Sequence, residues 1–106
     1  MPRPHNWVVI KMDGDEPHYR VLAGWSGGYL EGNYWQINSG ITRVEDDNNY
    51  YDFYGVSGSC YSCYKESYGL RQNNINVWSG LQRIHGHKVK MMDEETHWMS
   101  MDWIIK

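Results

Sequence analysis

Cysteine is scarce in this chain, as are proline, phenylalanine and long apolar runs. The 106 residues include two cysteines, three prolines and one phenylalanine. Two cysteines are too few for the disulfide framework of a small secreted domain. The first residues lack the apolar stretch of a signal peptide, and the longest apolar runs, 7–10 and 103–105, are far shorter than the roughly 20 residues that span a bilayer. We therefore expect one domain in a reducing, cytoplasmic setting, without a membrane partner.

A strong charge of either sign is also missing. The net charge is −3, and acidic and basic residues are spread along the chain. This balance does not favour a broad nucleic-acid-binding face, because such faces are usually strongly basic. The five histidines are accompanied by no recognisable nucleophile motif and no carboxylate pair in a diagnostic setting. The sequence therefore predicts a protein that is not an enzyme and holds no cofactor.

Aromatic residues are abundant instead, with six tryptophans and nine tyrosines. Most of them occur in short runs that glycine, asparagine and serine interrupt, and they do not follow helical spacing. A buried Trp or Tyr side chain removes roughly 150–250 Å² from water. This pattern predicts a small β domain whose core is built largely from aromatic rings.

Alternating apolar residues and turn residues define the expected strands. Ser39-Gly40 interrupts one of them, which is typical of a bend or bulge that curls a sheet. Residues 45–49 form the clearest hairpin loop, since five polar residues separate two β-prone runs. The expected strands are 7–12, 18–25, 34–44 with its bend, 50–56, 59–65 and 87–92.

One helix is expected at about residues 73–85. Asn73 or Asn74 can cap its start, and Gly86 follows its last turn. Apolar side chains at 3.6-residue spacing predict the face that packs on the sheet, which consists of Val77, Trp78, Leu81, Ile84 and His85.

Together these elements predict a mainly β fold, a small SH3- or Sm-like curled antiparallel sheet or barrel of five to six strands with one helix. An OB-type barrel and an open α+β sheet are the alternatives. Residues 1–106 are expected to form a single domain, with an N-terminal arm at 1–6 and an aromatic C-terminal tail at 93–106.

Cys60 and Cys63 form a CxxC pair, which can supply one side of a zinc site when it lies on a tight turn. His85 and His87 could complete such a site. However, residues i and i+3 of a strand point to opposite faces, and the flanking tyrosines are typical of a strand. We therefore interpret the two cysteines as ordinary thiols and keep a zinc-binding domain as an alternative.

The tyrosine-rich segment offers a second candidate site. Tyr51, Phe53 and Tyr61 could stack on the bases of single-stranded RNA or DNA, with Arg43 near the phosphates. The alternative is structural, because tyrosines often pair across strands and cover the edge of a core.

The C-terminal tail offers a third candidate. Its apolar side chains would form an interface for self-association if they did not return to the chain's own core. Packing inside the same chain is the alternative. The candidate interface residues are Trp98, Met101, Trp103 and Ile104.

Three runs resemble those of small proteins from tailed phages, notably marine cyanophages, and from marine metagenomes: VLAGWSGGY at 21–29, NSGI at 38–41 and YGVSGSCY at 54–61. The resemblance covers about residues 7–92 and implies a phage or marine metagenomic origin, the host cytoplasm, and a host or phage protein as partner. The expected barrel resembles that of Sm proteins, but their opening helix and RNA signature motifs are absent, so no RNA-contacting residue follows.

We therefore predict a non-enzymatic small β-barrel protein that acts by protein–protein association as an oligomer. Single-stranded nucleic-acid binding and zinc binding are the alternatives.

Overall fold

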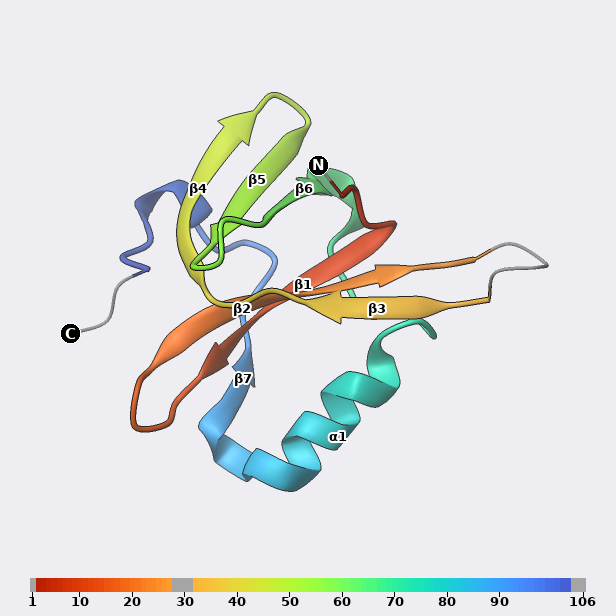
Figure 1. The fold of residues 1–106 in the computed structure, drawn as a ribbon, viewed down its shortest axis with the longest axis vertical. Coiled ribbons are helices and arrows are strands. Elements are labelled where there is room, and N and C mark those ends of the chain that lie inside the picture. Colours follow the sequence, from red (N-terminus) through yellow and green to blue (C-terminus); the bar gives the residue numbers. More distant parts are fainter. Residues whose placement is uncertain (1, 28–31, 104–106) are drawn as a thin grey trace.

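The computed structural model describes residues 2–27 and 32–103 and has two antiparallel sheets and one α-helix (Figure 1). The mainly β class with a single helix is thereby confirmed. The strands described number seven rather than five or six, because the bend at 38–40 divides the expected strand 34–44 into two. No strand pairing within the described residues closes the two sheets into a barrel.

The four-stranded sheet has the order β3-β2-β1-β7. A hairpin of β1 and β2 forms its centre, β3 lies at one edge and β7 at the other. Its strands are β1 (Asn6–Met12), β2 (His18–Trp25), β3 (Tyr34–Ile37) and β7 (Val89–Met91).

The three-stranded sheet has the order β4-β5-β6, and its strands are β4 (Ile41–Asp47), β5 (Tyr50–Gly55) and β6 (Cys60–Tyr64). The chain passes from β3 to β4 through a bend, where Gly40 has a φ of 123°, a conformation that favours glycine. The buried Asn38 side chain fixes this bend, because its Oδ1 accepts the N–H of Val21 at 2.9 Å.

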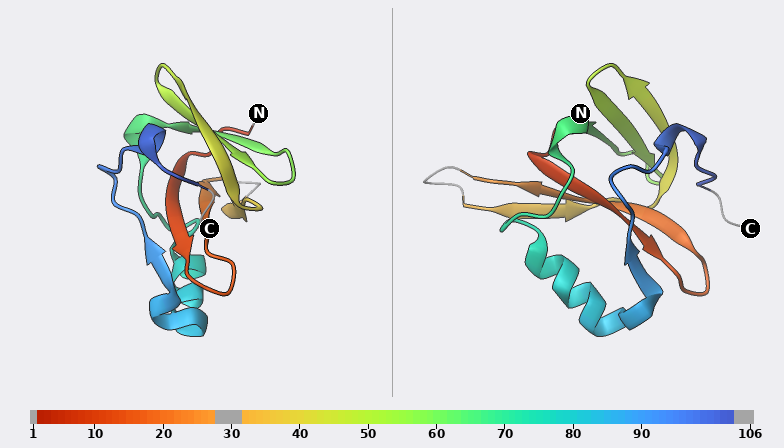
Figure 2. Two further views of the ribbon diagram at one scale, coloured as in Figure 1. Left: turned by 90° about the vertical axis from the view of Figure 1, so that its left-hand side faces the viewer. Right: turned by 180° about the vertical axis from the view of Figure 1, so that it is seen from behind.

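The four-stranded sheet has a core on each face, and β1 contributes to both. Val8 and Ile10 face the helix, whereas Trp7 and Val9 face the three-stranded sheet and the C-terminal segment. The two further views in Figure 2 show the helix and the three-stranded sheet on opposite sides of β1. This double burial explains why residues 7–10 are continuously apolar.

Helix α1 (Ile75–His85) ends at Gly86 as expected, since this glycine has a φ of 58°. Val77, Trp78 and Leu81 pack against the sheet. The prediction that Ile84 and His85 also face the sheet is wrong: Ile84 is 77% exposed and His85 is exposed. No α-helix or 3₁₀ turn within the described residues is long and apolar enough to cross a bilayer.

A buried network of three asparagine side chains joins the start of α1 to the central hairpin. Asn73 Nδ2 donates to Asn6 Oδ1 at 2.6 Å, and Asn6 Nδ2 donates to Asn74 Oδ1 at 3.2 Å. Asn74 occupies the N-cap position, but its side chain makes no capping bond to the helix. It instead accepts the N–H of Arg71 at 2.9 Å. The network therefore anchors the helix to β1 by hydrogen bonds inside the protein.

Candidate interaction surface

The tryptophans of the C-terminal tail lie in the protein's own core. Trp98 begins the 3₁₀ turn η3 (Trp98–Ser100) and is 2% exposed. Its ring centroid lies 5.9 Å from that of Trp7 and 5.9 Å from that of Phe53. Trp103 is also buried and packs edge-on against Tyr19, with the ring centroids 5.3 Å apart.

For Trp98 and Trp103, this placement corrects the expectation of an apolar interface. Trp98 and Trp103 are covered by the chain itself, and Met101 is half-buried against the same cluster. Ile104 lies outside the described residues. Packing inside the same chain is therefore the alternative that the structure adopts for the two tryptophans.

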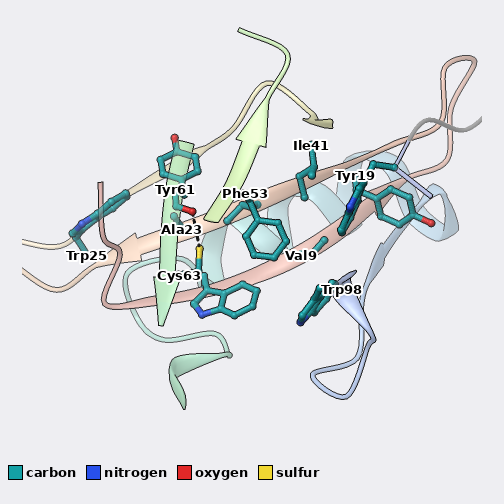
Figure 3. Close-up of a cluster of buried hydrophobic side chains, with 12 residues drawn as sticks. Val9, Tyr19, Ala23, Trp25, Ile41, Phe53, Tyr61, Cys63 and Trp98 are labelled. Carbon is teal, nitrogen blue, oxygen red and sulfur yellow. Dashed lines mark hydrogen bonds between the residues drawn. The ribbon is translucent and has the colours of Figure 1, made fainter. Parts of the chain in front are cut away.

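The tyrosine-rich segment divides between the two faces of the three-stranded sheet. Phe53 and Tyr61 point into the core, together with Cys63 (Figure 3). Phe53 is fully buried and Tyr61 nearly so, which prevents them from stacking on a base. Tyr51 is half-buried, and the Lys65 ammonium lies 4.6 Å from its ring centroid. The prediction is therefore wrong for Phe53 and Tyr61, which cannot form an exposed stacking surface with Tyr51.

The outer face of this sheet carries the other tyrosines. Its rings belong to Tyr50, Tyr54 and Tyr64, and two arginines of the chain already cover two of them. The guanidinium of Arg43 lies 3.8 Å from the ring centroid of Tyr54, and that of Arg3 lies 4.7 Å from Tyr50. Arg43 is also paired with Glu45, which lowers the pKa of that carboxyl group chiefly through their hydrogen bond. The face is therefore of mixed charge, and its cations already have partners.

The two cysteines point to opposite faces of β6, as strand geometry requires. Cys63 is fully buried in the core, and burial raises the pKa of its thiol well above the usual value. Cys60 is half-buried, and burial raises the pKa of this thiol as well. Within the described part of the chain, no three His, Cys, Asp or Glu side chains are arranged to hold a metal ion. The geometry of the pair therefore favours the interpretation as ordinary thiols.

Burial of Cys63 and Tyr68 predicts a loss of stability at alkaline pH. Burial raises the pKa of Tyr68 to about 12 and raises that of Cys63. Both groups ionise more easily in the unfolded chain, with pKa values of about 10 and about 8.5. Their stabilising contribution is therefore complete below about pH 8 and lost progressively as the pH approaches 12.

We expect the thermal midpoint, followed by circular dichroism, to fall between about pH 8 and 11. The Tyr68→Phe variant is the control, because its fall over this range should be smaller than that of the wild type. Equal falls in the two proteins would contradict the role of Tyr68.

Three of the four sheet edges are protected against pairing with another strand. The N-terminal arm covers the edge of β6, where the N–H of Ser62 donates to the carbonyl of Pro2 at 2.9 Å. Edge strand β7 has three residues, including an exposed lysine, Lys90. Edge strand β4 has an irregular register and carries the exposed charges Arg43, Glu45, Asp46 and Asp47.

Edge strand β3 is four residues long, and within the described residues it pairs with no segment other than β2 and carries no charged side chain. Its residues are Tyr34, Trp35, Gln36 and Ile37, and no charged residue or proline occurs from position 32 to position 41. Tyr34 stacks on Trp25 with the ring centroids 5.1 Å apart, yet it remains 45% exposed. Trp35, opposite Gly24 in the register, is 48% exposed. Figure 1 shows β3 beside β2, and the strand order places it at the edge of the sheet.

The hydrogen bonds at the end of β3 show which backbone groups face outward. The N–H of Asn38 donates to the carbonyl of Val21 at 3.1 Å, and these residues lie opposite each other if the β2–β3 register is continued. Because antiparallel ladders alternate, Gln36 and Tyr34 also point their backbone groups toward β2. The N–H and C=O groups of Trp35 and Ile37 therefore point away from the sheet.

No family model, curated protein sequence or solved structure was found to match this chain. The resemblance to phage and marine metagenomic proteins thus stays a prediction.

Proposed function

We propose that this protein acts without catalysis, by associating with other polypeptide chains through the edge of β3. The observation that carries the proposal is the contrast between the sheet edges. Pro2 protects the edge of β6, charged side chains protect the edge of β4, and β7 is short. By contrast, β3 presents an uncharged strand with a half-exposed tryptophan. Natural proteins usually protect such edges unless a partner uses them.

The chemistry at this edge suits the addition of an extended strand. Trp35 and Ile37 offer two N–H donors and two C=O acceptors at the spacing of an antiparallel ladder. Side chains on both sides of the strand add apolar contact, with Tyr34 on the face toward the three-stranded sheet and Trp35 on the face toward α1. In this mode of recognition, main-chain hydrogen bonds provide affinity and alternate side chains provide specificity. Tyrosine and tryptophan are also among the residues enriched at interface hot spots.

Selection of short random peptides on the immobilised protein tests the proposal. We expect enriched peptides with alternating apolar residues that bind the wild type and lose at least about 30-fold in affinity to the Trp35→Lys variant. Lysine on an edge strand is one of the residues that discourage strand pairing.

Val56→Lys is the matched control, since Val56 is also exposed but lies outside the strands. This variant should bind the selected peptides as well as the wild type does. Selection of no strand-like peptide, or equal binding to Trp35→Lys, would contradict the proposal.

A further inference from the structure

We infer that the partner at this edge is a second copy of the same chain, with β3 pairing antiparallel to β3 of the second copy about a two-fold axis beside Gln36. The inference rests on the proposed function and names its partner. The two four-stranded sheets would join into one continuous sheet across the axis.

The backbone of β3 is complementary to itself in this arrangement. With Gln36 opposite Gln36 of the second copy, Trp35 lies opposite Ile37 of the second copy, and the same pair recurs on the other side of the axis. Each pair joins two residues whose N–H and C=O groups point outward, so each pair exchanges two hydrogen bonds. This is the register in which both outward-facing residues of β3 pair with outward-facing residues of β3.

The side chains are also complementary. Trp35 and Ile37 lie on the same face of the sheet, the one that carries α1. Pairing therefore sets an indole beside a β-branched side chain twice, which is a favourable cross-strand combination. On the other face, the two Gln36 side chains lie opposite each other across the axis, and each keeps the hydrogen bond that its Oε1 accepts from the hydroxyl of Tyr61 at 3.1 Å.

Charge does not oppose a second copy as the occupant. Like charges placed opposite one another destabilise the pairing of identical strands, and residues 32–41 carry no charge. By contrast, the edge strand β4 carries Arg43, Glu45, Asp46 and Asp47. Self-pairing at β3 thus sets no charged side chain of the strand against its own copy.

Sedimentation velocity between about 5 and 500 μM, a range in which micromolar dimers dissociate, tests the inference. We expect the wild type and Val56→Lys to pass from monomer to dimer. Trp35→Lys should weaken the dimer at least about 30-fold. Circular dichroism of each variant verifies that it is folded.

A cysteine cross-link tests the register. In a non-hydrogen-bonded antiparallel pair the Cα atoms lie about 4.5 Å apart, which a disulfide can bridge. The Gln36→Cys variant should therefore form a disulfide-linked dimer under mild oxidation. The wild type, with Cys60 and Cys63 alone, is the control and should form much less.

The outcomes separate the two proposals. A wild type that stays monomeric throughout the range overturns self-pairing, whereas strand-like peptides that bind at β3 would still support the proposed function. A dimer that is unaffected by Trp35→Lys, or that Gln36→Cys does not cross-link, overturns the inferred interface.

Discussion

Replacing Trp98 with alanine is expected to lower the free energy of unfolding by about 3–5 kcal/mol, the usual range for removal of a buried tryptophan. The ring is 2% exposed and packs against Trp7, Phe53 and Tyr68, with centroid separations of 5.9 Å in each case. It also stacks on Trp103 at 6.3 Å. Alanine would therefore leave a cavity where the C-terminal segment joins the core. Urea unfolding followed by circular dichroism measures the change.

Met99→Ala is the control, since the neighbouring Met99 is 54% exposed. This variant should stay within about 0.5 kcal/mol of the wild type. Similar stability of Trp98→Ala and Met99→Ala would show that the C-terminal segment does not pack on the core in solution. The sequence-based hypothesis of an aromatic interface in the tail would then regain its support.

Gly24→Ala is expected to destabilise the protein by about 3 kcal/mol, since overpacking and the loss of buried hydrogen bonds each cost roughly 1–3 kcal/mol. A β-carbon at this position would lie 2.0 Å from the Oδ1 atom of Asn73. Asn73 is itself buried, and its Nδ2 atom donates to Asn6 and to Ser26. It could move aside only by giving up these hydrogen bonds. The same urea unfolding experiment measures the effect.

Gly14→Ala provides the matched control, because a β-carbon there meets no atom within 4 Å. Its effect should stay within about 0.5 kcal/mol. The double variant Gly24→Ala with Asn73→Ala gives a sharper test, because removing the Asn73 side chain also removes the clash. Its cost should be clearly less than the sum of the two single costs. Additive costs would contradict the proposed contact.

Local patterns predicted the helix end and the bend between β3 and β4. Gly86 and Gly40 lie where the backbone has a positive φ. Glycine is the residue that most readily adopts this conformation, so its presence in a sequence indicates such positions. The end of the apolar helix face was not predictable from spacing. Ile84 continues the 3.6-residue pattern, but it is 77% exposed, since packing depends on what lies opposite each turn.

The tyrosine-rich segment shows how alternation can mislead. The pattern established that Tyr51 and Phe53 share one face of β5 and that Tyr50 and Tyr54 share the other, but it did not establish which face is buried. Asp52 was the available signal, because a carboxylate on the side of Tyr50 and Tyr54 indicates the outer face. Asp52 itself is nearly fully buried, which the strand pattern does not encode.

The features that the sequence did not predict depend on contacts between distant segments. Asn6, Asn73 and Asn74 form their network across more than 60 positions of sequence, and no local pattern marks an asparagine as buried. The tail is similar, because its composition cannot show whether it returns to the core. The unprotected edge of β3 did leave a signal in the sequence, however. Residues 32–41 carry no charge, and this absence indicates a strand that can pair with another.

The position of Trp7 between early and late parts of the chain has a consequence for biosynthesis. Its ring meets Tyr68 and Trp98, and β1 also pairs with β7. During translation, the hairpin of β1 and β2 can form early, but the face that packs on α1 stays uncovered, and the three-stranded sheet covers only part of the other face, until the last third of the chain has emerged. Folding therefore depends on contacts between distant positions, which are slow to form and expose hydrophobic surface to aggregation meanwhile. A chain that stops before Trp98 would retain this exposed surface and become a substrate for chaperones and proteases.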